Sequence, residues 1–450
     1  MTRFAPSGPL RGTLRPPPDK SISHRAALIA AMGEGTTAIE GCLDAADTRG
    51  TVDAVKQLGA GVESSDAEQP GSIDLVVSGI GLRGPGERWR GGDQDIDVGN
   101  AGTLLRILPG WLAGQEAGAW TLDGDESIRR RPMDRIAEPL ALMGAKVSCR
   151  DGRLTPVHVE GAKLRGVEYR LPVASAQVKS CLLVAGLLAD GETRVVEGAT
   201  TRDHTERMLA AAGAEVAVTD LRSAPSVHSG PVRRIAVRPV ERLAPGQISV
   251  PGDFSSAAFL AVAAAIVHGS RVRLEDVGLN PTRIGLLGIL NRMGAALQVE
   301  EDLTRGGPEP RGAIVARHGP LGATRVQGDE VPLAIDELPL VALVGCFAEG
   351  TTVVSGAAEL RHKESDRIAT VVEGLRGIGA DVEARDDGFA VHGTGGVRGG
   401  ALDAHGDHRL AMLGAVAGLA SRDGVEVAGA DAAAISYPRF EADLASLLRQ

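Results

Sequence analysis

Aromatic residues, cysteines and long apolar runs are all scarce in this sequence. Phe, Trp and Tyr account for 2% of its 450 residues, so Ala, Leu, Val and Ile must form the core. The four cysteines are scattered without metal-ligand spacing, which indicates reduced thiols rather than a disulfide framework. The apolar stretch at residues 257–267 is too short to span a bilayer, and residues 1–10 lack a secretory apolar segment. We therefore expect a soluble, cytoplasmic protein.

The sequence also has fewer basic than acidic residues. The formal net charge is −10, which argues against a general binder of nucleic acid or of acidic membranes. The sequence contains no Walker A motif, no Gly-rich dinucleotide fingerprint after a strand and no His/Cys metal spacing. It therefore gives no support for a nucleotide cofactor or a structural zinc ion.

What the sequence does contain is one repeated pattern: an Ala- and Leu-rich run, a turn glycine and a short β-like run. The turn glycines of its six copies are Gly35, Gly118, Gly191, Gly269, Gly350 and Gly424. A second helix follows in most copies and ends in a Gly-Ala pair, whose glycine suits a left-handed helix stop. These stop glycines are Gly59, Gly144, Gly213, Gly294 and Gly379. Each repeat is therefore expected to form helix, strand, helix and strand, with connecting β segments.

Grouped by threes, the six repeats predict two α/β domains. We place repeats one to three in residues 19–245 and repeats four to six in residues 246–450. The N-terminal β-like stretch, residues 1–18, is expected to join the second domain. Because the Ala-rich helices are apolar on most faces, we expect them to be buried beneath the sheets.

This arrangement requires the chain to cross between the domains twice. The expected crossings are the proline run at residues 16–18 and the segment at residues 243–246. Two crossings would form a hinge and a closable cleft. Residues 63–71 and 301–312 are expected to be exposed loops.

A polar cluster precedes the first helix of every repeat. The clusters lie at residues 19–25, 99–103, 174–179, 251–256, 335–337 and 406–409. Helix N-termini present unpaired N–H groups and a partial positive charge, so they attract anions. Capping explains Ser, Thr, Asn and Asp at such places, but it does not explain Lys20, Arg25, Lys179 and Arg409. Equivalent helix starts can converge on one site, and cations retained there predict a strongly anionic ligand.

Lysine is rare and its positions are informative. It occurs only at positions 20, 56, 146, 163, 179 and 363. Lys20, Lys179 and Lys363 lie within polar motifs, where a compact charge that can also handle a proton is favoured.

Further charged clusters precede the second helices of three repeats. They lie at residues 125–132, 201–207 and 361–367. On a helix, Lys363 and Arg367 would lie on one face with Glu364 beside them, although such spacing also fits an ordinary solvated face. Several cations in one place suit substrates that carry phosphate and carboxylate groups. Asp336 and Glu364 in that field could transfer protons.

Read in order, these clusters resemble the motifs of the 5-enolpyruvylshikimate-3-phosphate synthase family. The resemblance rests on residues 19–25, 99–103, 131–133, 175–177, 202–206, 363–367 and 407–409, which run in family order over nearly the whole chain. It implies two domains, each an inside-out α/β barrel of three βαβαββ repeats, with the active site in the cleft between them. It also implies transfer of the enolpyruvyl group of phosphoenolpyruvate to the 5-hydroxyl of shikimate-3-phosphate, with release of phosphate. No metal or organic cofactor is implied, and we expect a monomer.

The resemblance also assigns roles to individual residues. It implies that shikimate-3-phosphate is held by Lys20, Ser21, Arg25, Ser175, Ala176, Gln177, Arg202, Asp336 and Lys363. It implies that phosphoenolpyruvate is held by Lys20, Gly102, Arg131, Gln177, Arg367 and Arg409. Lys20 would lie between the two substrates. Asp336 would remove the proton of the 5-hydroxyl, and Glu364, with Lys363 nearby, would give and take the proton at the methylene carbon.

The sequence departs from the family pattern at a few positions. Many members carry a lysine in the C-terminal segment where this chain has Ile435, and a second serine where it has Ala176. Arg202 stands near the place where others use tyrosine. Gly102 is retained, which leaves room for glyphosate, a mimic of phosphoenolpyruvate.

Two other functions compete with this one. The sister enzyme that acts on UDP-N-acetylglucosamine shares the repeats, but it has a reactive cysteine shortly before the arginine that matches Arg131, and residues 123–130 contain none. It also has Lys-Asn where this chain has Lys20-Ser21. A non-catalytic repeat scaffold with an anion groove would need surplus positive charge and stacking aromatics, and the chain has neither.

Overall fold

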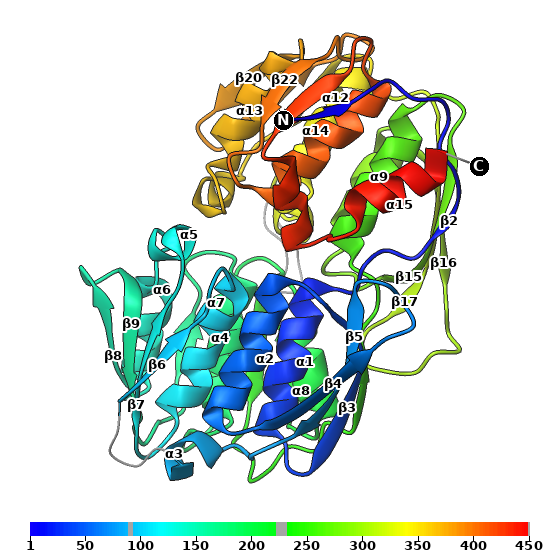
Figure 1. Cartoon of the computed structure of the whole chain (residues 1–450). Helices are drawn as coiled ribbons and strands as arrows, with labels where there is room; N and C mark the ends of the chain where they lie inside the picture. Colours follow the sequence, from blue (N-terminus) through cyan, green and yellow to red (C-terminus); the bar gives the residue numbers. More distant parts are fainter. Residues whose placement is uncertain (89–92, 222–231, 449–450) are drawn as a thin grey trace. The chain divides into compact units, whose positions relative to one another are not determined.

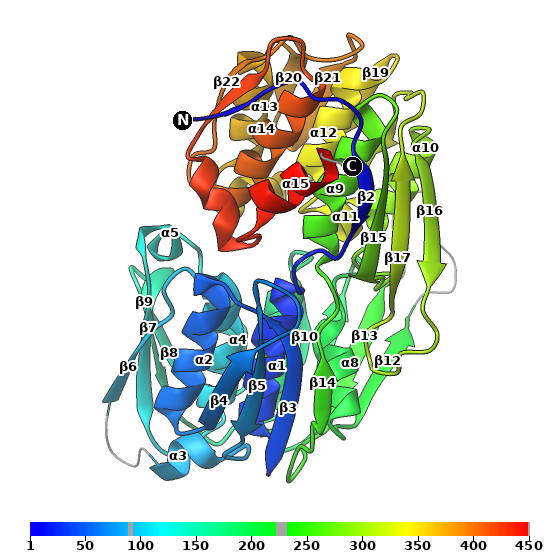
Figure 2. The ribbon, with the colours of Figure 1, turned by 45° about the vertical axis from the view of Figure 1, so that its right-hand side comes forward.

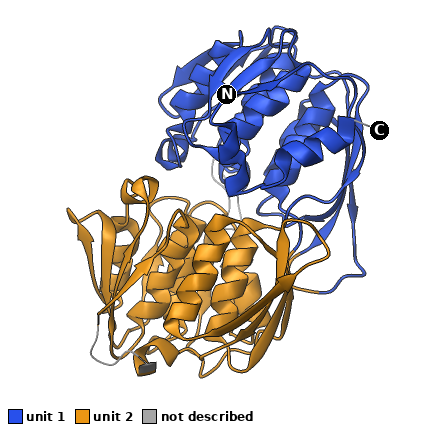
Figure 3. Cartoon of the chain, in the orientation of Figure 1, with its two compact units in different colours: residues 1–17, 251–306, 310–450 blue, residues 18–250, 307–309 orange. Residues whose placement is uncertain are grey.

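The computed structural model describes residues 1–88, 93–221 and 232–448. The chain forms two compact units (Figures 1 and 3). Unit 1 comprises Met1–Pro17, Pro251–Gly306 and Pro310–Gln450, and unit 2 comprises Pro18–Val250 and Gly307–Glu309. The N-terminal segment therefore belongs to the unit formed mainly by the C-terminal half.

Unit 2 consists of three repeats whose sheets pack against three buried helices (Figure 1). The buried helices are α1 (Lys20–Met32), α4 (Gly102–Ala113) and α7 (Ala176–Gly186). The first sheet has the strand order β14 (Gln247–Ser249), β3 (Thr36–Leu43), β5 (Ser72–Ser78) and β4 (Gly61–Asp66). The second has the order β6 (Asp93–Asp97), β7 (Ala119–Asp123), β9 (Leu154–Glu160) and β8 (Lys146–Arg150). The third has the order β10 (Glu168–Arg170), β11 (Thr193–Glu197), β13 (Arg233–Val237) and β12 (Val216–Asp220). The remaining helices are α2 (Ala46–Leu58), α3 (Gly84–Arg88), α5 (Glu126–Arg129), α6 (Asp134–Leu142) and α8 (His204–Ala211).

Unit 1 repeats this plan with two four-stranded sheets and one three-stranded sheet. Its buried helices are α9 (Phe254–Ile266), α12 (Leu338–Phe347) and α14 (His408–Ala420). The first sheet has the strand order β2 (Arg11–Leu14), β15 (Arg271–Gly278), β17 (Arg311–Arg317) and β16 (Ala296–Glu301). The second has the order β18 (Arg325–Val326), β19 (Thr351–Val354), β21 (Gly388–His392) and β20 (Asp381–Arg385). The three-stranded sheet has the order β1 (Thr2–Phe4), β23 (Val425–Ala428) and β22 (Gly400–Asp403). The other helices are α10 (Gly285–Arg292), α11 (Glu330–Ala334), η1 (Ala358–His362), α13 (Arg367–Gly377), η2 (Ala430–Ile435) and α15 (Phe440–Leu448).

The strand pairing follows one rule in every four-stranded sheet. The outer strand at one edge runs parallel to its neighbour, and the other pairs are antiparallel. A parallel pair needs a long crossover, and in the sheets of β6, β10 and β18 the buried helix provides it. Within the described ranges no sheet closes on itself, so the expected barrels are open sheets arranged around buried helices.

Each unit has one apolar core, built largely from aliphatic side chains as predicted. Every residue of α9 is buried. A helix that is apolar on all sides has no face for water, so its flanks must be covered by sheets and by neighbouring helices. Only the ends of these helices are then available for chemistry.

The glycines assigned to turns and helix stops all have positive φ. The six turn glycines span 74° to 99°, and the five stop glycines span 87° to 112°. Residues with a Cβ are disfavoured in this left-handed region. The predicted turns and helix ends of the repeats are therefore confirmed.

Chain order and strand pairing disagree at two outer strands. β2 precedes α1 of unit 2 but pairs with β15 of unit 1, as Figure 2 shows. β14 precedes α9 of unit 1 but pairs with β3 of unit 2. The second change of unit therefore falls at Val250–Pro251 instead of residues 243–246, because β14 must first reach β3.

Two segments expected to be exposed loops are more structured than predicted. β4 extends to Asp66, so the first part of residues 63–71 forms a strand at a sheet edge. Between β16 and β17, Gly307–Glu309 packs within unit 2, and Glu309 is buried. Both segments are short and polar, so hydrophobic periodicity cannot reveal their structure.

We predict that Gly269→Ala destabilises the protein by about 1 kcal/mol, because an L-residue is strained at positive φ. Gly269 has φ +74°, and an added methyl group would make only an ordinary contact, 3.6 Å from Pro9 Cβ. Gly288→Ala is the matched control in the same unit, because Gly288 lies within α10 and has open space around it. This change should be neutral or stabilising by up to about 1 kcal/mol. Urea unfolding of both variants measures the difference, and equal stabilities would contradict the prediction.

Candidate active site

The three buried helices of unit 2 are hydrogen-bonded to one another within their first two turns. Gln177 at the start of α7 donates to Thr103 Oγ1 at the start of α4, at 3.3 Å, and accepts from Arg106 of α4. Arg25 of α1 donates to Ser180 Oγ of α7 at 3.1 Å. Each helix directs the positive end of its dipole to this place. The helix starts that were predicted to converge do so within this unit.

Arg25 is buried and held by uncharged groups. Its Nε donates to Thr205 Oγ1 at 2.8 Å, and its Nη1 donates to the Ser21 carbonyl at 2.9 Å. Among the residues described, no carboxylate lies within 4.0 Å of its guanidinium. Burial lowers the pKa of Arg25 to about 10, although Glu206 acts in the opposite direction. A buried cation without a direct counter-ion provides a favourable field for an anion.

Lys20, the first residue of α1, is paired with an acid that the sequence analysis missed. Its Nζ lies 2.9 Å from Oδ2 of Asp47, which is buried at the start of α2. His24 Nε2 lies 3.8 Å from the same oxygen. Burial alone would raise the pKa of Asp47, but Lys20 and His24 outweigh burial and lower this pKa. An acid in the first turn of a helix is so common that the sequence carries no signal for this role.

The start of α4 lies against the guanidinium of Arg131. A methyl group on Gly102 would come within 2.5 Å of Arg131 Nη1, so glycine leaves room for this side chain. The N-cap residue of α4 is Ala101, whose side chain makes no capping hydrogen bond. Arg131 is buried, whereas its neighbour Arg130 forms an exposed ion pair with Glu126. Only one arginine of this adjacent pair is therefore held inside the unit.

Lys179 does not meet an anionic ligand, and that prediction is wrong. It is fully buried, with Nζ 2.9 Å from Glu197 Oε2 and 2.7 Å from Glu206 Oε1. Burial would lower the pKa of Lys179, but the two glutamates raise it. Lys179 lies one full turn beyond Ser175, the N-cap of α7, so it belongs to the core and not to the helix start.

The remaining predicted residues of unit 2 are half-buried positions at or beside helix starts. Ser175 caps α7, accepting a hydrogen bond from the Val178 N–H at 3.4 Å, and Ala176 is the first residue of that helix. Ser21 is the second residue of α1. Arg202 lies just before α8. These side chains keep the exposure that a ligand contact requires.

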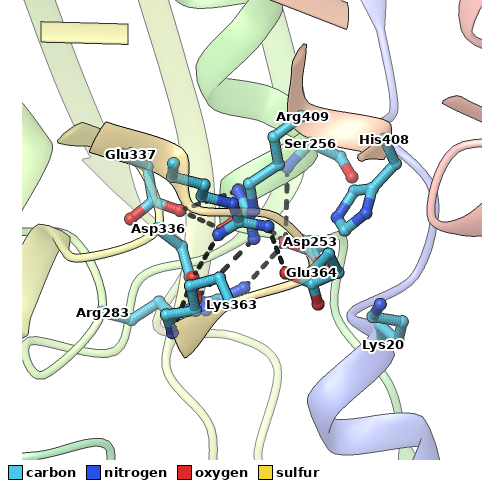
Figure 4. A network of polar contacts seen from close by, with 12 residues as sticks. Lys20, Asp253, Ser256, Arg283, Asp336, Glu337, Lys363, Glu364, His408 and Arg409 are labelled. Atoms are coloured by element: carbon cyan, nitrogen blue, oxygen red, sulfur yellow. Dashed lines mark hydrogen bonds and ion pairs between the residues drawn. The ribbon is translucent and has the colours of Figure 1, made fainter. Parts of the chain in front are cut away.

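In unit 1, Asp336 lies among three cations. Its Oδ1 is 3.1 Å from both Lys363 Nζ and Arg367 Nη1, and its Oδ2 is 3.8 Å from Arg409 Nη2. Figure 4 shows Asp336, Lys363 and Arg409 directed toward one another. The predicted unit 1 residues, which are far apart in sequence, therefore form one cluster. This cluster consists of Asp336, Lys363, Glu364, Arg367 and Arg409.

A second buried acid, Asp407, organises the arginines of this cluster. Arg367 Nε donates to Asp407 Oδ2 at 2.8 Å, and Arg367 Nη2 donates to Glu364 Oε2 at 2.5 Å. Burial alone would lower the pKa of Arg367, but Asp407, Glu364 and Asp336 raise it above its usual range. Burial would raise the pKa of Asp407, and Arg367 lowers it. Asp407 also caps α14 by accepting from the Arg409 N–H at 2.9 Å, so one carboxylate positions both arginines.

Lys363 and Glu364 reach the cluster from a connection and not from a helix. Both lie between η1 and α13. The prediction that Lys363 and Arg367 share one helix face is wrong, although both contact Asp336. The physical reason is Asp366, which caps α13 with its side chain and makes the helix begin after it.

Further buried polar residues belong to the cluster and were not assigned from the sequence. Arg409 Nη1 lies 3.5 Å from Glu337 Oε1, which also accepts a hydrogen bond from Ser255 of α9. Asp253 caps α9 and pairs with Arg283 at 3.0 Å. The starts of α9, α12 and α14 are thus linked like those of unit 2. Glu337 and Asp253 lie in the polar clusters at residues 335–337 and 251–256 that precede helices, whereas no sequence pattern marks Arg283.

Other classes of site find no support in the part of the chain that the structure describes. In that part, no group of three or more His, Cys, Asp or Glu side chains is arranged to hold a metal ion. The same described residues form no helix that is long and apolar enough to cross a bilayer. Ile435, at the end of η2, is half-buried and supplies no cation.

Comparison with known proteins shows similarity over the whole length. The family described as EPSP synthase (3-phosphoshikimate 1-carboxyvinyltransferase) matches residues 4–444. The 3-phosphoshikimate 1-carboxyvinyltransferase of Synechococcus sp. (strain WH7803) is 45% identical over 442 residues, covering 98% of this chain and 96% of the relative. The enzyme of Shouchella clausii (strain KSM-K16) is 44% identical over 439 residues, covering 97% and 96%.

Solved structures agree with this result. The EPSP synthase of Acinetobacter baumannii has a TM-score of 0.82 and 39% identity, covering 99% of this chain and 97% of that one. The enolpyruvyl transferase NikO from Streptomyces tendae has a TM-score of 0.70 at 17% identity, so it shares the fold. The predicted two-domain α/β fold is confirmed.

The Asp47–Lys20 pair predicts a pH-dependent stability. Asp47→Asn should destabilise the protein by about 2 kcal/mol at pH 7, because it leaves the Lys20 ammonium without its buried partner. A carboxyl whose folded pKa is lowered stabilises the protein above its unfolded pKa, about 3.9, and this stabilisation is lost as pH falls through the folded pKa. The loss of stability caused by Asp47→Asn should therefore become smaller below pH about 4. Asp53→Asn, at an exposed position of the same helix, is the control; a deficit that persists in acid would contradict this account.

Proposed function

The chain belongs to the EPSP synthase (3-phosphoshikimate 1-carboxyvinyltransferase) family, and we propose that the residues gathered at its helix starts carry that family's reaction. The protein is an enolpyruvyl transferase of the shikimate pathway. It transfers the enolpyruvyl group of phosphoenolpyruvate to the 5-hydroxyl of shikimate-3-phosphate and releases phosphate. The observation that carries the assignment of roles is the cluster around Asp336, where acids and cations suited to proton transfer and anion binding meet.

Unit 2 supplies most of the proposed site for shikimate-3-phosphate. The charge of Arg25 has no direct carboxylate partner among the described residues, and the accessible side chains of Ser21, Ser175 and Gln177 lie at the same helix starts. Hydroxyl and amide groups suit the hydroxyls of a sugar-like ring, and guanidinium suits its phosphate. Arg202, at the start of α8, adds a second cation. The proposed set is completed by Lys20, Ala176, Asp336 and Lys363.

Phosphoenolpyruvate is proposed to bind to three arginines. It carries a phosphate and a carboxylate, and each can accept two parallel hydrogen bonds from a guanidinium. Arg131 lies beside the start of α4, whose N-cap residue Ala101 makes no side-chain bond to the helix N–H groups. Arg367 and Arg409 are held in place by Asp407. The proposed set is completed by Lys20, Gly102 and Gln177.

Glu364 and Asp336 are proposed to move the protons. Glu364 protonates the methylene carbon of phosphoenolpyruvate, and the 5-hydroxyl oxygen adds to C2 while Asp336 accepts its proton. The tetrahedral intermediate then loses phosphate, which takes up the proton held by Asp336, and Glu364 takes a proton back from the methyl carbon to form the enol ether. The contacts of Glu364 with Arg367, and of Asp336 with Lys363, support these roles, because they hold both carboxylates beside the cations that are proposed to bind the substrates.

The identity of the acceptor can be tested directly. Phosphate release from phosphoenolpyruvate is measured with shikimate-3-phosphate or with UDP-N-acetylglucosamine as the second substrate. Release only with shikimate-3-phosphate is expected. Release only with the nucleotide sugar would favour the sister enzyme, and release with neither would favour the non-catalytic scaffold.

Three further properties are proposed from the resemblance. The reaction needs no metal or organic cofactor, the enzyme acts as a monomer, and it works in the cytoplasm. Light scattering during gel filtration tests the oligomeric state, and activity after exhaustive chelation tests the metal requirement.

Glu364→Gln should lower kcat by about 10²–10⁴-fold, because it removes the group that transfers the proton to carbon. Binding of both substrates should change far less. Glu373→Gln is the control, since Glu373 lies exposed on α13. Steady-state kinetics distinguish the two variants, and an unchanged kcat would remove Glu364 from the mechanism.

Arg131→Ala should raise KM for phosphoenolpyruvate by about 10-fold or more, because it removes a charge-assisted contact to the anion. Arg130→Ala should leave KM unchanged, because Arg130 is exposed and paired with Glu126. The two neighbours carry the same side chain, but one is buried and the other is exposed and ion-paired. Equal effects of the two changes would contradict the assignment of Arg131.

A further inference from the structure

A short excursion of the chain packs against unit 2 near the proposed shikimate-3-phosphate site. The connection between β16 and β17 leaves unit 1 at Gly306, places Gly307–Glu309 in unit 2 and returns at Pro310. Prolines at positions 308 and 310 restrict the backbone on both sides of Glu309. Glu309 is 5% exposed although the connection around it is polar. A buried carboxylate in a polar connection indicates a specific contact.

Glu309 and its neighbour contact the first turn of α8. Glu309 Oε1 lies 2.8 Å from Nδ1 of His204, which is 1% exposed. Arg207 Nη1 donates to the Pro308 carbonyl at 3.2 Å, and Arg207 Nε donates to Asp203 Oδ1 at 2.9 Å. Two consecutive residues of the excursion are therefore bound to one helical turn. This turn has no side-chain cap of its own at Asp203.

The same turn of α8 carries a residue, Thr205, that contacts the proposed substrate site. Thr205 Oγ1 accepts from Arg25 Nε at 2.8 Å and lies 2.6 Å from Ser180 Oγ. Arg202 lies immediately before the turn. His204 therefore stands in the chain between two residues that arrange the shikimate-3-phosphate site, and its ring is held by Glu309.

We propose that Glu309 is a positioning residue for shikimate-3-phosphate binding. Through His204, Glu309 fixes the first turn of α8. It thereby fixes Arg202 and Thr205, and Thr205 in turn orients Arg25. This role rests on the proposed function of the unit 2 site. If the Glu309–His204 contact served stability alone, its loss would lower the unfolding midpoint and leave affinity for the substrate unchanged.

The test measures shikimate-3-phosphate binding to the free enzyme by titration calorimetry. Glu309→Ala should weaken binding about fivefold, the effect of losing one buried hydrogen bond, while KM for phosphoenolpyruvate stays within about twofold of the wild-type value. Glu309→Gln should recover most of the affinity, because its amide can still hydrogen-bond to His204. His204→Ala should weaken binding to the same degree, and the double variant no further, because both changes break one contact.

Asp302→Ala is the matched control. Asp302 lies on the same connection but bonds to Thr304 within it, so binding should be unchanged. Arg207→Ala, which removes the second contact, should weaken shikimate-3-phosphate binding in the same direction and provides a test if Glu309→Ala does not fold. Unchanged substrate affinity in Glu309→Ala or Arg207→Ala, with or without a lower unfolding midpoint, would overturn the positioning role. Failure of the wild-type protein to bind shikimate-3-phosphate would instead overturn the proposed function.

Discussion

The convergence of three buried helix starts in each unit is the constraint on which the site depends. Helices such as α9 are apolar on every side, so their flanks are enclosed and only their ends can meet a ligand. Each N-terminus brings unpaired N–H groups and a partial positive charge. In unit 2 hydrogen bonds from Gln177 and Arg25 tie these ends together, and in unit 1 the Glu337 carboxylate links Ser255 to Arg409.

The sequence predicts those features of the fold and the site that a few adjacent residues determine, and it does not predict those that depend on the tertiary fold. Positive-φ glycines and helix caps are dictated by a few adjacent residues, so the repeats and the helix starts were predictable. Burial is decided by the tertiary fold, so the sequence alone does not separate Arg131 from Arg130, or show that Lys179 lies in the core. Asp47 and Arg283 contact partners that are distant in the chain. The resemblance to a family, not periodicity, supplied the roles of the remaining site residues.

The acids of unit 1 fall into two kinds. Asp407 has no exposed surface and binds Arg367 through both oxygens, so it is a permanent counter-charge. Glu364 and Asp336 keep 22% and 10% of their side chains exposed and share the same guanidinium. The buried Asp407 and these two partly exposed carboxylates therefore converge on one buried cation.

The exchanged outer strands have a consequence for synthesis on the ribosome. β2 emerges among the first residues, but its partner β15 is made only after the whole of unit 2. The first sheet of unit 2 likewise waits for β14, at the far end of that unit's sequence. Nascent chains therefore carry two unpaired edges for most of elongation, and unpaired edges favour aggregation. The exchange of outer strands thus leaves the nascent chain open to association through these edges until both partner strands have been synthesised.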